Sequence, residues 1–179
     1  MRKYAILCLT LLAVVQTSRA QLNGNYTIGG GGASFPTFGT AIAALTTQGI
    51  SGNVTFRVRP GQYEERFEIN TIPGANTNRR VVFESENSDS SSVRLFTSTA
   101  NAGSNWVVSL QNIGQITFRH LSFAAPSTGL YGLVFSASNC ANLLIEHCAF
   151  SGIHTGNINN NTQNIVTIAG NCPGFQFRN

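Results

Sequence analysis

The sequence predicts a parallel β-solenoid, a fold in which each repeat of the chain forms one coil of short strands. Residues 112–123 and 139–150 match position by position at an offset of 27, and a third copy follows at 171–179. Within each copy, apolar residues alternate with other residues at period two, which is typical of strands. The main rival, a leucine-rich repeat, needs regularly spaced leucines before the asparagine that opens each copy. Val, Ser, Ala and Gly stand there instead.

The amino-terminal twenty residues are predicted to be a signal peptide. Arg2 and Lys3 precede an apolar run at 5–15, and small residues flank the cleavage point after Ala20. That run is too short to cross ~30 Å of hydrocarbon. We therefore expect residues 21–179 to be exported, either secreted or held at the cell surface, without a transmembrane segment.

The composition of the mature chain excludes several classes of partner. The whole sequence has 11 basic and 7 acidic residues, and three of the basic residues lie in the signal peptide. The remaining eight arginines against seven acids give 8 − 7 = +1, with no lysine left. Because phosphate binding needs clustered cations, we expect no nucleic acid and no anionic lipid as a partner.

A short helix is predicted to cap the start of the solenoid within residues 34–50. Thr37 can cap its amino terminus, and the apolar residues that follow fall on one helical face. These residues are Phe38, Ala41, Ile42 and Leu45. Such a helix can cover the open end of a coil stack, whose backbone and core would otherwise be exposed. The coils themselves are expected over 53–179.

Strand patterns follow the helix at regular intervals. Arg57 and Arg59 alternate on the first of these strands and are expected to share a solvent-facing side. The expected strands are 54–58, 67–69, 81–83, 93–96, 106–110, 116–118, 133–135, 143–145, 165–168 and 175–177.

Stacking of the three copies predicts columns of side chains at the strand spacing of ~4.8 Å. The asparagines form one column at a turn, where amides can bond to one another. Arg119, Glu146 and Arg178 form an outward column of alternating charge. His120 and His147 stack beside it. Two stacked imidazoles could begin a metal site, but their place in a repeated turn favours turn hydrogen bonding. The columns at the turn are Asn112, Asn139, Asn171 and Ile113, Cys140, Cys172.

A resemblance extends this interpretation. The helix ending in AIAAL, followed by GISGNVTFRVRPGQYEERFEI, resembles the beginning of pectin-lyase-like right-handed parallel β-helix proteins. Gly61, Tyr63 and Glu65 match the GxYxE element near the start of pectin methylesterases. The resemblance covers residues 28–179 and implies an all-β, right-handed parallel β-helix. Similar starts occur in bacterial β-helix surface proteins that lack known catalysis.

The sequence assigns no catalytic residue, metal ligand or cofactor, and leaves substrate-binding residues unknown. Glycoside hydrolysis uses two positioned carboxyl groups, but Asp89 is the only aspartate and lies in a serine-rich turn. No position matches the Asp pair, the glutamines or the arginine of the esterases. We expect Glu65 to make a structural hydrogen bond.

Three cysteines remain after cleavage. Cys140 and Cys172 occupy the same coil position, and a Cα separation of ~4.8 Å allows a disulfide. Side chains stacked in parallel need not be oriented for such a bond, so two reduced thiols that fill the ladder are favoured and the disulfide stays open as the alternative. Cys148 replaces Leu121 in the repeat, which indicates packing and not nucleophilic chemistry.

Two hypotheses of function follow. The first is an exported, non-catalytic scaffold for adhesion or glycan contact on a bacterial surface, with a polysaccharide or surface glycan as partner. Its binding groups would lie in loops such as 127–132 and 151–163. The second is the amino-terminal part of a pectinesterase- or polysaccharide-lyase-like enzyme whose active site lies downstream. Because the third copy stops at Asn179, before the equivalents of Leu121 and Phe123, we expect the solenoid to be truncated at its carboxy end.

Overall fold

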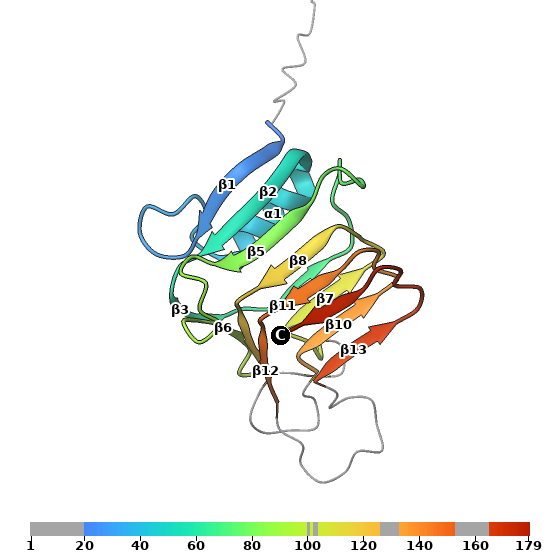
Figure 1. The fold of residues 1–179 in the computed structure, drawn as a ribbon. Helices are drawn as coiled ribbons and strands as arrows, with labels where there is room; N and C mark the ends of the chain where they lie inside the picture. The colour runs from blue at the N-terminus through green and yellow to red at the C-terminus, as the bar shows by residue number, and fades with distance from the viewer. Residues whose placement is uncertain (1–19, 100, 102–103, 126–132, 153–164) are drawn as a thin grey trace, which may run out of the picture.

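The computed structural model describes residues 20–99, 101, 104–125, 133–152 and 165–179. Its described part confirms the predicted fold class, a mostly β chain that forms a parallel β-solenoid with one short helix near the amino terminus (Figure 1). Residues 1–19, where the signal peptide is predicted, and most of the loops at 127–132 and 151–163 lie outside the described residues. No helix among the described residues is long and apolar enough to cross a membrane.

The first coil contains the helix. Strand β1 (Leu22–Ile28) precedes α1 (Phe38–Gln48), and β2 (Ile50–Val58) returns parallel to β1. Thr37 and Thr40 form a capping box at the start of α1. The helix buries the predicted face and also Ala44. It covers the amino-terminal end of the stack, while β1, which no strong alternation marks in the sequence, adds an edge strand.

Three parallel sheets form the walls of the solenoid. The first sheet has six strands in the order β1-β2-β5-β8-β11-β14, and the second and third have the orders β12-β9-β6-β3 and β13-β10-β7-β4. The strands after β2 are β3 (Gly61–Glu64), β4 (Phe67–Ile69), β5 (Val81–Ser85), β6 (Val93–Phe96), β7 (Val108–Gln111), β8 (Ile116–Arg119), β9 (Ser122–Ala124), β10 (Phe135–Ser138), β11 (Leu144–Glu146), β12 (Ala149–Ser151), β13 (Val166–Ala169) and β14 (Gln176–Arg178).

A column of aromatic rings runs through the core along the first sheet. Strand register places Phe56, Phe83 and Phe118 in line, followed by Ile145 and Phe177. The first three rings stack with centroids 4.8 and 5.4 Å apart and planes within 17° and 11°. They are fully buried, so the solenoid has a packed interior.

The turn between the third and first sheets carries the asparagine column. Asn112 and Asn139 adopt φ of 53° and 54°, a left-handed conformation that Asn tolerates, and the Asn139 amide donates to Asn112 Oδ1 at 3.2 Å. Asn171 joins only through its backbone N–H, which donates to Asn139 Oδ1 at 3.0 Å. Gly170 takes the left-handed position, because this turn holds one residue more than the preceding one. The expected stack of three amides is therefore a stack of two.

Candidate binding groove and charge ladder

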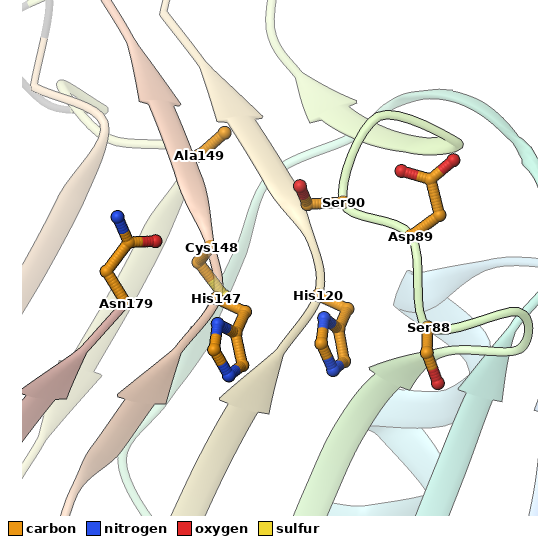
Figure 2. Close-up of a pocket in the computed structure, with 8 residues that line it drawn as sticks. All are labelled: Ser88, Asp89, Ser90, His120, His147, Cys148, Ala149 and Asn179. Atoms are coloured by element: carbon orange, nitrogen blue, oxygen red, sulfur yellow. The ribbon is translucent and has the colours of Figure 1, made fainter.

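An open pocket of about 480 Å³ lies at the corner between the first and second sheets. We call it the corner groove. The β5–β6 loop forms one side, and the residues that follow β8, β11 and β14 form its length (Figure 2). It is lined by Ser88, Asp89, Ser90, His120, His147, Cys148, Ala149 and Asn179.

The two histidines lie side by side in the groove, as the repeat predicts. Their ring centroids are 4.9 Å apart and their planes differ by 7°. Both have left-handed backbones, with φ of 52° at His120 and 49° at His147. The turn hydrogen bonds come from their backbone N–H groups, which donate to Glu146 O and Arg178 O. No described residue forms a hydrogen bond with either ring, so the expected turn bonding by the imidazoles is not observed and their nitrogens remain open to a ligand.

Asp89 lies across the groove from His120 in the exposed β5–β6 loop. Its Oδ1 accepts hydrogen bonds from the Ser91 hydroxyl at 2.7 Å and the Ser91 N–H at 2.8 Å. These bonds lower the pKa of the Asp89 carboxyl, and the nearby His120 adds a smaller effect of the same sign. Asp89 is therefore an anionic acceptor at neutral pH.

Cys148 follows His147 at the floor of the corner. Its thiol donates to Glu146 O at 3.4 Å, and burial raises its pKa to about 11. Because the thiolate is the reactive form, the thiol is poorly nucleophilic near neutral pH. This agrees with the packing role expected from its repeat position.

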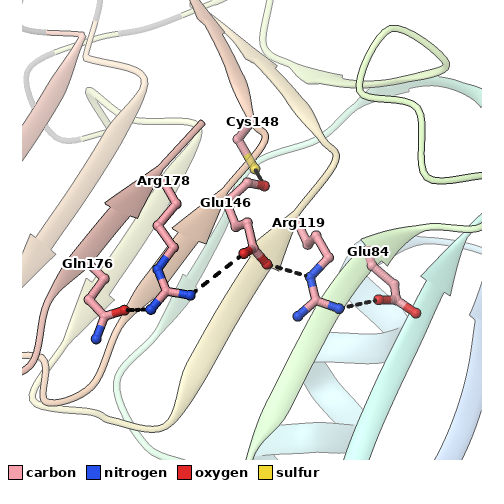
Figure 3. Close-up of polar contacts among 6 residues, drawn as sticks. All are labelled: Glu84, Arg119, Glu146, Cys148, Gln176 and Arg178. Atoms are coloured by element: carbon pink, nitrogen blue, oxygen red, sulfur yellow. Dashed lines mark hydrogen bonds and ion pairs between the residues drawn. The ribbon is translucent and has the colours of Figure 1, made fainter.

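A column of alternating charge runs along the outward face of the first sheet beside the groove (Figure 3). Arg119 lies at its centre, with Nε 2.8 Å from Glu146 Oε2 and Nη1 3.4 Å from Glu84 Oε2. Arg57 pairs with Glu84 at 3.7 Å, and Arg178 with Glu146 at 3.9 Å. We call these five residues the charge ladder. The sequence predicted three of its members. Arg57 and Glu84 were missed, although their offset is also 27.

The ladder and the groove are built from adjacent residues of the same coils. Arg119 precedes His120, Glu146 precedes His147, and Arg178 precedes Asn179. Each of these three coils therefore supplies one ladder side chain and one groove side chain. Successive coils repeat this pair at about the strand spacing of ~4.8 Å.

The GxYxE element is structural. Glu65 accepts hydrogen bonds from the N–H groups of Phe38 at 3.1 Å and Gly39 at 2.8 Å, which anchors the start of α1 as expected for a structural role. Tyr63 donates to Arg59 O at 2.8 Å. Arg59 itself donates to Gly31 O at 2.6 Å. Arg59 therefore clamps the glycine-rich loop and does not share the solvent-facing side of Arg57, since β2 ends before it.

Other candidate groups are far from this corner or do not form a site. Cys140, Cys148 and Cys172 are free thiols in the structure, which leaves the disulfide a prediction. Among the described residues, no three His, Cys, Asp or Glu side chains come together as a metal site.

Comparison with known proteins gives a likeness of shape alone. No family model and no curated protein matches the sequence. Two solved chains of the pectin methylesterase from Aspergillus niger, both deglycosylated forms, are similar, each with a TM-score of 0.42. The first is 18% identical over 87% of this chain and 58% of its own length, and the second is 16% identical over 86% and 69%. This chain thus spans less than two thirds of the first. Since a shared fold does not transfer an activity, the function has to be argued from side chains.

Proposed function

We propose that this chain is an exported, non-catalytic β-solenoid scaffold that contacts a glycan at the cell surface through the corner groove. The observation that carries the proposal is the side-by-side placement of His120, His147 and Asn179 on successive coils of an open, polar groove. An extended polymer can follow such a row, because each coil offers hydrogen-bonding groups at a regular step.

The chemistry of the groove suits a ligand rich in hydroxyl groups. The imidazole nitrogens and the Asn179 amide can donate or accept, and the Asp89 carboxylate accepts. Pockets for small ligands are usually concave and mostly apolar, whereas this groove is open and lined by polar side chains. The neighbouring ladder alternates in sign, so it does not select a ligand by strong net charge. These features favour a polysaccharide surface contact.

The described carboxyl and thiol groups of this corner are not arranged as a general acid or a nucleophile. A general acid needs a proton near neutral pH, but hydrogen bonds from Ser91 lower the pKa of Asp89. Burial holds the Cys148 thiol in its protonated form. Glu84 and Glu146 are both ion-paired to Arg119. This supports a binding role for the groove.

The test is a glycan array followed by polysaccharide binding in solution, with the mature chain and the His120→Gly/His147→Gly double variant. Gly removes the imidazoles without placing another hydrogen-bonding side chain in the groove, and it adopts the left-handed backbone at both positions. Glu68→Gln, an exposed change on β4 of the third sheet, is the matched control. We expect the double variant to lose at least tenfold in affinity and the control to retain it. Failure of every glycan to bind, or equal binding by the double variant, would refute the proposal.

A second candidate is the amino-terminal part of a pectinesterase- or polysaccharide-lyase-like enzyme. One observation favours it: two carboxylates, Glu84 and Glu146, flank Arg119 on one outward face. Methanol release from pectin and the formation of unsaturated products from polyuronate would measure such activity. Turnover by this chain that Glu84→Gln or Glu146→Gln abolishes would replace the non-catalytic proposal.

A further inference from the structure

We propose that Cys140 and Cys172 form a disulfide after export and that this bond staples the last two coils. The two residues lie at the turn between the third and first sheets, on adjacent coils. The sulfur of Cys172 accepts a hydrogen bond from the backbone N–H of Cys140 at 3.3 Å. One thiol therefore already lies against the backbone of the other residue.

The surroundings of the two thiols repeat from one coil to the next. Cys140 donates to Ser138 O at 3.3 Å, and Cys172 donates to Ala169 O at 3.2 Å. Ser138 and Ala169 are direct partners in the parallel register of β10 and β13. The coil step of ~4.8 Å lies within the Cα separations that disulfides adopt. Rotation of the thiols away from these carbonyls can bring the sulfurs together without moving a strand.

The difference in exposure sets the order of the chemistry. Cys140 is 1% exposed and burial raises the pKa of its thiol, whereas Cys172 is partly exposed. Cys172 is therefore the more accessible thiol, and it attacks the oxidant first. With a low-mass disulfide such as oxidised glutathione, this forms a mixed disulfide and releases one glutathione thiolate. The Cys140 thiolate then attacks the Cys172 sulfur and releases the second glutathione, so two thiols are oxidised and one glutathione disulfide is reduced.

The staple joins the last two described coils, whose strands have few neighbours among the described residues. Strands β12, β13 and β14 are the outermost strands of their sheets, and β14 is exposed at all three residues. Closing a loop of 172 − 140 = 32 residues lowers the entropy of the unfolded chain. The bond would hold the coil that supplies Arg178 and Asn179. The predicted export places the chain where disulfides persist.

Cys148 serves as an internal reference because it lies at a different corner. Its thiol bonds to Glu146 O beside His147, and burial raises its pKa to about 11. A slow, buried thiol of this kind is a poor competitor for either of the other cysteines. The structure therefore predicts one bridge and one remaining thiol in the mature chain.

The experiment equilibrates the purified mature chain with oxidised glutathione, alkylates it in denaturant and maps the thiols by mass spectrometry. We expect Cys148 alone to be alkylated and a mass two hydrogens below the reduced chain. Cys140→Ser and Cys172→Ser should each free the other thiol, while Cys148→Ser keeps the bridge. Reduction should lower the melting midpoint of the wild type and Cys148→Ser by roughly 10 °C and leave the other two variants unchanged. Three alkylated thiols, or a bridge that includes Cys148, would overturn the proposal, whatever the glycan results are.

Discussion

The two ends of the solenoid place the same column of side chains in opposite environments. At the amino-terminal end, Phe56 is fully buried beneath Tyr26 of β1 and Phe35. At the other end, Phe177 occupies the same register in β14 and is 51% exposed. Phe83 lies between the stacked rings of Phe56 and Phe118, Phe118 lies between Phe83 and Ile145, and both phenylalanines are fully buried.

This difference shows what buries a side chain in a solenoid. An inward position on a strand is not sufficient to bury a side chain, because each coil covers only one side of the next coil. Burial needs a second neighbour, either another coil or a capping element such as α1. The fold is therefore held by contacts between coils, and stability should fall steeply for changes in the middle and weakly for changes at β14.

Truncating one ring in the middle of the stack and one in β14 tests this difference between the two regions. Phe83→Ala leaves a cavity between stacked rings and should lower the free energy of unfolding by about 3–5 kcal/mol. Phe177→Ala removes a half-exposed ring and should lower it by less than about 1 kcal/mol. Urea unfolding monitored by circular dichroism measures both. Equal losses would mean that the carboxy-terminal coil is as well packed as the middle.

The second prediction concerns the capped end. Glu65→Gln replaces one carboxylate oxygen with an amide that cannot accept a hydrogen bond, so one N–H at the start of α1 loses its partner. Loss of a charge-assisted bond should lower the free energy of unfolding by about 1.5–3 kcal/mol. Glu68→Gln, which changes the same group on the exposed side of β4, is the control and should have no measurable effect. Similar values for the two variants would show that Glu65 does not anchor the helix.

The sequence predicted the repeated parts of the molecule well and the unrepeated parts poorly. The offset of 27 located Arg119, Glu146 and the histidine pair, because stacking turns sequence period into spatial contact. The capping helix was found from Thr37 and its apolar face. Strand β1 was missed, since LNGNYTI contains glycine and asparagine and pairs only because β2 lies beside it.

The corner groove could not be predicted from the sequence repeat, and the reason is physical. Its far side comes from the β5–β6 loop, which has no counterpart in the repeat. Hydrogen bonds within the loop hold Asp89 in place, and no periodic pattern indicates that it lies opposite His120. The position of Arg59 also depends on a unique feature, the glycine-rich loop that its guanidinium contacts. The sequence repeat predicts which residues are neighbours on successive coils. Which residues lie across a corner depends on loops that are not part of the repeat.

The charge ladder shows the same difference between a central residue, Arg119, and a terminal one, Arg178. Arg119 contacts two carboxylates, whereas Arg178 at the exposed end contacts Glu146 only at 3.9 Å. Since these groups are partly exposed and screened by solvent, Arg119→Gln should cost about 1 kcal/mol of unfolding free energy. Arg178→Gln should be close to neutral. Both are measured by urea unfolding at low and high salt. High salt should reduce the cost of Arg119→Gln, and a cost that does not depend on salt would argue against ion pairing.

The fourth and smallest effect lies in the β5–β6 loop, outside both the stack and the cap. Hydrogen bonds from Ser91 lower the pKa of Asp89 below its ordinary value in the folded chain. A carboxyl whose pKa is lower when folded stabilises the fold above its unfolded pKa, and this contribution is lost as the pH falls through the folded pKa. Ser91→Ala should therefore lower the unfolding midpoint at pH 7 by roughly one to two degrees.

This difference should shrink as the pH falls below the ordinary pKa of an aspartate and through the lowered pKa of Asp89, because the carboxyl becomes protonated in both proteins. Ser90→Ala is the control, because Ser90 lies in the same loop and its side chain forms no hydrogen bond with Asp89. Thermal unfolding from pH 7 to pH 2 measures the effect. If the difference between the unfolding midpoints of Ser91→Ala and the wild type instead stays constant from pH 7 to pH 2, contacts other than the Asp89 carboxylate hold the loop. The β5–β6 loop would then stay in place beside the corner groove at acid pH.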